Sequence, residues 1–376
     1  MAERLITEAD LDDLAVGAAI LGTGGGGDPH IGRLLAHSAV RTGGPARLVP
    51  LEEVPDDAVT VMVAMMGAPT VMLEKVPSAE QVATAVRALA RYLGRKPTHL
   101  VCAEAGGVNA LVPVVAAARL GLPMIDADAM GRAFPELQMV IPTLYGLTAT
   151  PMSIADEKGN QGIFDTVDNH WAERLARSAT IDMGCSAMIS LFAMDGPKAR
   201  EALVPGTLSL CAELGRLVRE ARAAHRDPVA TVVGRLGGVE LFAGKVVDVA
   251  RRTEGGFARG EAAIAGVGGH AGEDFLLRFQ NEHLVAVREG VVVASVPDLI
   301  CVLDAETGTA VTTETLRYGQ RVRVIAAPCD PRWHSPEGVK LVGPRYFGYD
   351  HDPVRVPAGA HRRTPDSGRA AAEARP

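Results

Sequence analysis

Three carboxylic acids that follow apolar runs of the chain are the residues best suited to chemistry. Glu104 follows the run His99–Ala103, and Asp126 and Asp128 follow the run Leu122–Ile125. If both runs are neighbouring parallel strands, their carboxyl ends open onto one crevice. Three close carboxylates repel one another unless a cation neutralises them or one keeps a proton. The pattern therefore predicts catalytic acids at this crevice.

The same three acids could also hold a metal. We expect Glu104, Asp126 and Asp128 to bind a divalent cation, with zinc favoured and manganese or magnesium as alternatives for such oxygen-rich ligation. The structural alternative is that Asp126 or Asp128 caps a helix, which is common for aspartate.

A glycine-rich loop, Leu-Gly-Thr-Gly-Gly-Gly-Gly-Asp-Pro, lies near the N-terminus. Gly24, Gly25, Gly26 and Gly27 let the main chain run close to a ligand, so we predict that they bind substrate. The loop lacks the Lys-Ser/Thr of a P-loop, and a helix rather than a strand precedes it, so no nucleotide cofactor is expected. The alternative is a flexible connection between two helices.

Three further polar residues adjoin these segments. His30 follows the glycine loop and is predicted to be a general base or metal ligand, and Asn109 follows Glu104 and is predicted to bind substrate. Arg132 could form a bidentate pair with a substrate carboxylate. It could equally form a structural pair with Glu136, four residues later on a helix.

Other histidines and cysteines form no recognisable cluster. The chain has no HExxH motif, which would indicate zinc, and no GxSxG elbow, which would indicate a serine hydrolase. His270 and His334 are expected to be solvated or structural. Cys185 is expected to be buried in the middle of a helix and inert.

Apolar periodicity predicts the elements that position these residues. Buried strands and amphipathic helices alternate, and this alternation is typical of an α/β domain with a parallel sheet. The predicted strands are 59–66, 99–103 and 122–125, and the predicted helices are 7–21, 30–37, 78–93 and 108–120.

The pattern changes after about residue 167. Helices are expected over 171–194 and 205–225, followed by short β runs punctuated by Gly, Pro and Asp. Such runs are typical of a barrel- or sandwich-like fold. We therefore predict an α/β domain over residues 1–166, a helix and β-rich domain over 167–356, and a disordered tail over 357–376.

Composition restricts the classes of partner. A net charge of −7 and an aromatic content of 4% argue against nucleic acid and anionic membranes as partners. Five cysteines lie far apart in the sequence, and the N-terminus does not resemble a signal peptide, so a cytoplasmic protein is expected. We also expect a homo-oligomer.

Several ordered segments resemble those of one known family. LGTGGGGDP, CAEAGGVNA, DADAMGRAFPELQM, RFQNEHLVA and LVGPRYFGYD are similar to landmarks of the bacterial S-methyl-thiohydantoin desulfurase-like family, over about residues 8 to 355. The resemblance implies a hydrolase that removes sulfur from a thiohydantoin or S-methyl-thiohydantoin ring, or acts on a hydantoin-like ring. Its substrate would be a small cyclic amide or thioamide. The alternative is a non-catalytic accessory subunit of a hydantoinase or oxoprolinase-type assembly.

Overall fold

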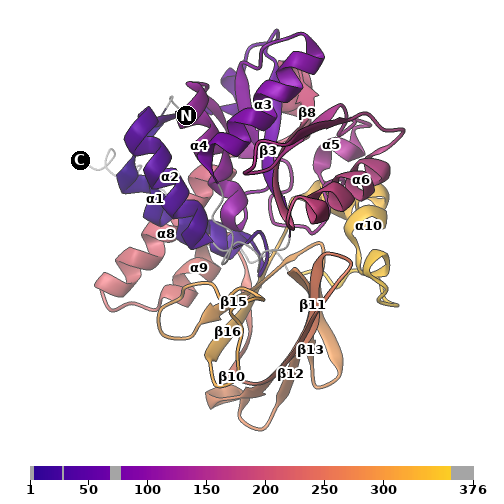
Figure 1. Ribbon diagram of the computed structural model, residues 1–376. Helices are drawn as coiled ribbons and strands as arrows, with labels where there is room; N and C mark the ends of the chain where they lie inside the picture. The colour runs from indigo at the N-terminus through magenta and orange to yellow at the C-terminus, as the bar shows by residue number, and fades with distance from the viewer. Residues whose placement is uncertain (1–3, 28, 68–77, 357–376) are drawn as a thin grey trace, which may run out of the picture.

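The computed structural model describes residues 4–27, 29–67 and 78–356, which form two sheets with helices around the first (Figure 1). Within these ranges the first sheet has nine strands and the second has seven. The predicted fold class is confirmed: an α/β part with parallel strands precedes a part with helices and a curled antiparallel sheet. The predicted tail, 357–376, lies outside the described residues.

The centre of the first sheet is parallel. β2 (Ala46–Pro50), β5 (Met124–Asp128), β4 (His99–Cys102) and β3 (Thr60–Gly67) lie in that order. The three predicted strands are therefore confirmed, although β5 extends to include both aspartates. Antiparallel strands complete the sheet: β1 (Arg4–Ile6), β6 (Met152–Ala155), β7 (Gln161–Phe164), β8 (Ser186–Met194) and β9 (Val204–Pro205).

Helices cover both faces of this sheet, because its strands carry apolar side chains on each side. The cluster on one face includes residues of α1 (Glu8–Leu21), α2 (Pro29–Gly43), α3 (Ala79–Leu93), α4 (Val112–Leu120), α8 (Thr207–Ala223) and α9 (Pro228–Leu236). The cluster on the other face includes residues of α5 (Ile141–Leu144), α6 (Asn169–Asp182), α7 (Gly196–Ala202) and α10 (Pro336–Val342).

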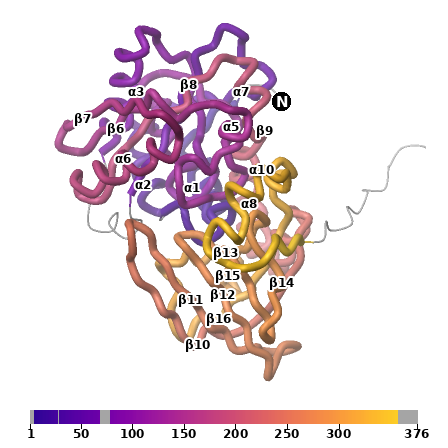
Figure 2. Tube along the Cα trace, turned by 90° about the vertical axis from the view of Figure 1, so that its right-hand side faces the viewer, coloured from indigo at the N-terminus to yellow at the C-terminus, as the bar shows by residue number. Residues whose placement is uncertain are grey.

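The second sheet is antiparallel and curls around its own apolar core, which includes Phe242, Phe275 and Phe279. Figure 2 shows it below the first sheet. Its order is β14-β13-β12-β11-β10-β16-β15. The strands are β10 (Val239–Glu254), β11 (Phe257–Gly266), β12 (Asp274–Gln280), β13 (Glu282–Arg288), β14 (Val291–Ser295), β15 (Leu299–Asp304) and β16 (Arg321–Ala327).

Short 3-10 helices connect several of these elements. They are η1 (Leu51–Glu53), η3 (Gly107–Ala110), η4 (Gly268–His270), η5 (Pro331–His334) and η6 (Pro344–Phe347). After β16 the chain returns to the first sheet, where α10 lies near α5.

One predicted helix is wrong in its second half. The helix expected over 171–194 ends at Asp182, and Ser186–Met194 is instead the buried strand β8. Gly184 and Cys185 have positive φ angles of 85° and 62°, which break the helix. A continuous apolar run does not distinguish a buried helix from a buried strand. Cys185 consequently lies in a turn and is half-exposed, not buried in a helix.

The boundary between the two sheets does not coincide with the change in sequence pattern near residue 167. β8 and β9 lie after residue 166 yet pair with strands of the first sheet, and the second sheet begins at Val239. The domain boundary at residue 166 stays a prediction. None of the described helices is long and apolar enough to cross a membrane.

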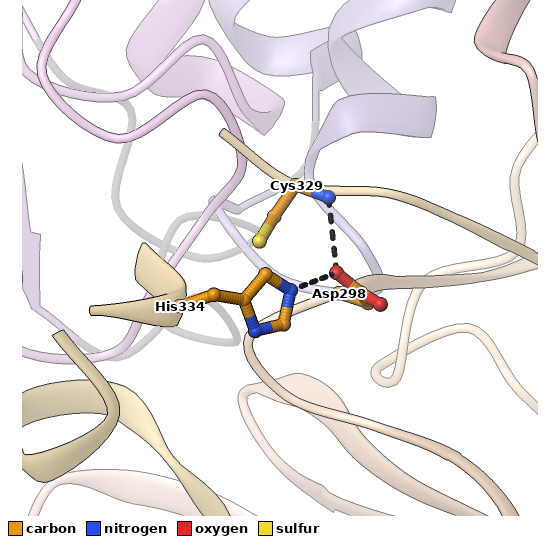
Figure 3. Close-up of side chains that lie close together, drawn as sticks. All are labelled: Asp298, Cys329 and His334. Carbon is orange, nitrogen blue, oxygen red and sulfur yellow. Dashed lines mark hydrogen bonds and ion pairs between the residues drawn. The ribbon is translucent and has the colours of Figure 1, made fainter. Parts of the chain in front are cut away.

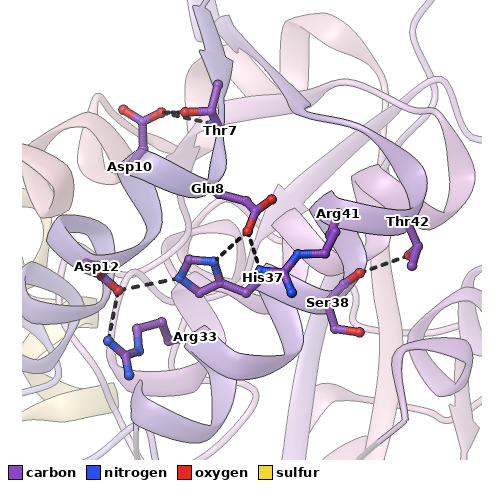
Figure 4. A network of polar contacts seen from close by, with 9 residues as sticks. All are labelled: Thr7, Glu8, Asp10, Asp12, Arg33, His37, Ser38, Arg41 and Thr42. Carbon is purple, nitrogen blue, oxygen red and sulfur yellow. Dashed lines mark hydrogen bonds and ion pairs between the residues drawn. The ribbon is translucent and has the colours of Figure 1, made fainter.

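A polar network fastens α1 to α2 at the surface (Figure 4). Arg41 bonds to Glu8 and Arg33 bonds to Asp12, each at 2.8 Å, while His37 lies between the two acids. Such exposed pairs are screened by solvent and stabilise little. The two helices on either side of the glycine loop are therefore oriented mainly by their buried faces.

Helices α1 and α8 approach so closely that glycine is required where they cross. A Cβ atom at Gly17 would lie 1.8 Å from the carbonyl oxygen of Cys211, and one at Gly215 would lie 1.9 Å from that of Asp13. Real atoms do not approach to such distances, so any larger residue must push the helices apart.

Gly17→Ala is therefore expected to lower the free energy of unfolding by about 2 kcal/mol, because the added methyl group cannot be accommodated. Gly234→Ala is the matched control, since a Cβ there meets nothing within 4 Å inside α9. This control should stabilise the protein by up to about 1 kcal/mol. Urea unfolding of both variants checks the comparison, and equal effects would contradict it.

Candidate active site

A cavity, partly open to solvent, lies at the carboxyl ends of β3 and β4 and extends to the start of β13. Its walls are mainly apolar, with a few polar groups. The lining residues are Gly26, Gly27, Met62, Ala64, Met65, Met66, Gly67, Ala103, Glu104, Asn109, Met130, Phe134, Pro135, Glu136, Leu137, Val140, Arg177, Ile189, Leu191, Phe192, Asn281 and Glu282. An apolar cavity with few polar groups is typical of a small-molecule site.

Glu104 is held in this cavity by Asn109. It lies two residues beyond the end of β4, is buried, and accepts a hydrogen bond at Oε1 from Asn109 Nδ2. Asn109 is itself fixed, because its Oδ1 accepts from the main-chain nitrogen of Met65 at 2.7 Å. Oε2 of Glu104 is buried and has no hydrogen-bond partner within the described residues. Glu104 and Asn109 thus lie together, as the prediction of one pocket requires.

Burial changes the protonation of Glu104. Removing the carboxylate from water raises its pKa to about 7, more than the Asn109 hydrogen bond lowers it. A carboxyl with a pKa near neutrality is suited to give and take protons at neutral pH.

Glu282 is a second carboxyl in the cavity, and the sequence reasoning did not single it out. It is the first residue of β13 and is buried. Its Oε2 likewise has no hydrogen-bond partner in the part of the chain that is described. Burial raises its pKa well above the ordinary value, and the charge of Glu104 raises it further. The sequence signal was the polar group Asn-Glu-His between the apolar strands of the segment RFQNEHLVA.

Arg132 is a cation whose charge lowers the pKa of both acids, but it does not line the cavity. It is fully buried and donates to Thr23 Oγ1 at 2.8 Å and to the carbonyl oxygen of Asp298 at 2.7 Å. Longer hydrogen bonds reach the carbonyl oxygens of Pro297 and His283. Neither a pair with Glu136 nor a position for a substrate carboxylate is seen. Its guanidinium joins the glycine loop to the second sheet.

The glycine loop lies against the second sheet. A Cβ at Gly25 would lie 1.9 Å from Oε1 of Glu282, and one at Gly24 would lie 2.7 Å from the ring of His283. Thr313 N donates to the carbonyl oxygen of Gly24 at 2.9 Å. Gly26 and Gly27 line the cavity, whereas Gly24 and Gly25 permit close packing. Asp28 lies outside the described residues.

Asp126 and Asp128 lie away from the cavity. Both point to the face of β5 that α8 covers, because alternate residues of a strand face the same side. Asp126 accepts from Ser209 N at 3.0 Å and Ser209 Oγ at 2.6 Å in the first turn of α8. Asp128 accepts from Ala105 N and Gly131 N, and burial raises its pKa to about 7. Asp126 therefore caps the helix α8, which was the structural alternative to a role in the site.

The predicted metal ligands therefore do not gather. In the described ranges, the only group of three or more acids, histidines or cysteines whose ligand atoms all lie within 4.8 Å is Asp298, Cys329 and His334. Glu104, Asp126 and Asp128 do not form such a group. His30 is exposed at the start of α2, 3.2 Å from Arg33, and is not part of the cavity lining.

Comparison with known proteins identifies the family. A family model described as S-Me-THD-like, N-terminal domain, matches residues 9–166, and one described as S-Me-THD-like, C-terminal domain, matches residues 167–356. The chain belongs to the S-Me-THD-like family. No curated protein matches it.

The fold of this S-Me-THD-like protein is also found in a crystal structure of a protein from Chromobacterium violaceum. The two are 24% identical, with a TM-score of 0.79 over 94% of this chain and 100% of the other. The likeness shows a shared fold. Both family domains contribute to the cavity, since Glu104 and Asn109 lie in the first and Glu282 and Arg177 in the second.

Glu104→Gln is expected to flatten the pH dependence of stability in this S-Me-THD-like protein. Between the ordinary glutamate pKa of 4.5 and about 7, the folded state keeps a proton that the unfolded chain has lost, so wild-type stability falls as pH rises. One pKa unit corresponds to about 1.4 kcal/mol. The free energy of unfolding of Glu104→Gln, relative to that of wild type, should therefore rise by at most about 3 kcal/mol between pH 4 and pH 8.

Chemical denaturation across this pH range measures the effect. Glu53→Gln, at an exposed glutamate, is the control and should leave the slope unchanged. Parallel curves for wild type and Glu104→Gln would show that Glu104 is not a buried, proton-holding carboxyl.

Proposed function

We propose that this S-Me-THD-like protein is a hydrolase that removes sulfur from a thiohydantoin or S-methyl-thiohydantoin ring. The observation that carries the proposal is the pair of buried carboxyls, Glu104 and Glu282, in one cavity. The pKa of each is raised, and each has one oxygen without a protein partner among the described residues. Family membership supports the choice of ring.

The two carboxyls are suited to different steps because their protonation differs. Glu104, with a pKa of about 7, is partly ionised at neutral pH and can take a proton from water. Glu282, with a pKa raised well above its usual range, keeps its proton and can donate it. A difference in pKa between two neighbouring acids is the usual basis for assigning one as the base and the other as the acid.

In the proposed reaction, Glu104 removes a proton from water as the water oxygen bonds to the ring carbon that carries sulfur. The tetrahedral intermediate then loses its carbon–sulfur bond, and Glu282 protonates the departing sulfur. S-methyl-thiohydantoin and water thus give hydantoin and methanethiol. The proton taken by Glu104 returns to Glu282 through solvent, which restores both groups.

The rest of the cavity fits a small, flat, uncharged ring. Met62, Met66 and Phe134 offer apolar walls, and Gly26 and Gly27 allow the main chain to approach the ring closely. Arg177 lines the cavity, so we assign to it the substrate-binding role that was predicted for Arg132. It is paired with Glu173 and lies 4.4 Å from the centre of the Phe257 ring, so it is positioned to meet a substituent at the cavity edge.

Turnover of S-methyl-thiohydantoin, thiohydantoin and hydantoin in labelled water tests the function. We expect release of methanethiol or sulfide, with the label in the new ring carbonyl. Ring opening of hydantoin alone would assign the protein to the cyclic amidohydrolases. If none of the three reacts, the accessory-subunit alternative is favoured.

Variants of the two carboxyls test their roles. Glu104→Gln and Glu282→Gln should each lower kcat by roughly 100-fold or more, because a positioned acid or base contributes that much. An S-aryl substrate, whose thiolate leaves without a proton, should restore turnover by Glu282→Gln but not by Glu104→Gln. Asp126→Asn is the matched control and should keep wild-type kcat. If Asp126→Asn loses kcat and the two glutamate variants keep it, the catalytic acid lies on β5 instead.

The pH profile provides an independent check. Because Glu104 must be ionised, kcat/KM should rise with pH up to about 7, and because Glu282 must be protonated, it should fall at higher pH. A profile that is flat from pH 5 to pH 9 would contradict this pairing.

Self-association into a homo-oligomer stays a prediction, which light scattering of the purified protein checks.

A further inference from the structure

A second cluster of side chains, outside the cavity, brings together an acid, a thiol and an imidazole (Figure 3). Asp298 lies between β14 and β15, Cys329 follows β16, and His334 ends η5. One ligand atom from each lies within 4.8 Å of the others. Three separate segments thus converge on one point.

The positions of the three side chains are fixed by their neighbours. Asp298 Oδ1 lies 2.9 Å from His334 Nε2 and accepts from Cys329 N at 3.1 Å. Asp298 Oδ2 accepts from Val356 N at 2.7 Å. The side chains of Asp298 and His334 are 1% and 13% exposed. The donor atoms are therefore held in place and largely shielded from solvent before any ligand binds.

We propose that Asp298, Cys329 and His334 form a zinc site. One oxygen, one sulfur and one nitrogen donor suit zinc, whereas calcium and magnesium prefer oxygen ligands alone. Three protein ligands leave a fourth position of a tetrahedral site for water. Binding displaces the proton of the Cys329 thiol, whereas His334 coordinates as a neutral imidazole that carries its proton on the other ring nitrogen.

The role assigned to this zinc site is to fasten the second sheet to the wall of the cavity. Arg132 donates to the carbonyl oxygen of Asp298. Trp333, beside His334, donates to the carbonyl oxygen of Met130 at 2.8 Å and packs edge-on against Phe134. Met130 and Phe134 line the cavity. The zinc site does not depend on the proposed reaction.

A hydrolytic Cys–His–Asp triad fits the same residues less well. Cys329 Sγ donates to the carbonyl oxygen of Asp330 at 3.3 Å. Burial, together with the charge of Asp298, raises the pKa of the thiol, which opposes formation of a nucleophilic thiolate. A metal ion supplies the positive charge that such a thiolate needs.

The first experiment measures zinc in the full-length protein, stripped with a chelator and dialysed against Zn²⁺. Wild type is expected to retain one Zn²⁺ per chain by elemental analysis. Cys329→Ser and His334→Ala should bind at least about tenfold more weakly, since each removes a ligand. The matched controls Cys185→Ser and His270→Ala, at residues outside the cluster, should bind as wild type does. Equal retention by all five proteins, or none by wild type, overturns the proposal.

Cobalt substitution gives a second readout, and its decisive measurement is made on wild type alone. Co²⁺ bound to wild type should show a thiolate charge-transfer band in the near ultraviolet, which Cys185→Ser keeps and Cys329→Ser lacks. Zn²⁺ should also raise the melting temperature of stripped wild type by several degrees, because it binds the folded state. Absence of the band in cobalt-loaded wild type overturns the proposal.

Discussion

The buried guanidinium of Arg132 is the interaction on which the relation between the two sheets depends. It donates to Thr23 in the glycine loop and to the carbonyl oxygen of Asp298 in the second sheet. A buried cation is costly unless its donors are used and an acid lies nearby. Main-chain carbonyls and the Thr23 hydroxyl use these donors, and the carboxylate of Asp298 offsets the charge. The cavity lies where this interaction holds the sheets together.

The run of glycines in the glycine loop is explained by the same close contact with the second sheet. Its main chain must pass between Gly106 and Gly107 on one side and Glu282 and His283 on the other, where a Cβ atom has no room. Close packing therefore explains much of the run of glycines, and only its last two residues reach the cavity. This close approach costs chain entropy, and it brings a carboxyl of each family domain to one place.

Buried acids give the cavity its chemical character and reduce the stability of the fold. Glu104 and Glu282 are removed from water and each leaves an oxygen without a partner among the described residues. Such groups disfavour folding when ionised, and they persist where the surrounding packing compensates. Here the apolar clusters on both faces of the first sheet provide that packing. The arrangement is typical of a site that exchanges protons.

The sequence by itself determined the parallel strands, the family and the place of Glu104 and Asn109, because apolar runs and local motifs record these features directly. It did not determine which face of β5 its aspartates occupy, since that depends on the strand's neighbours, nor that Ser186–Met194 is a strand. Glu282 is distant in sequence from Glu104, and Asp298 is distant in sequence from Cys329 and His334. Only tertiary packing brings such residues together, because contacts between separate segments leave no periodic trace in the chain.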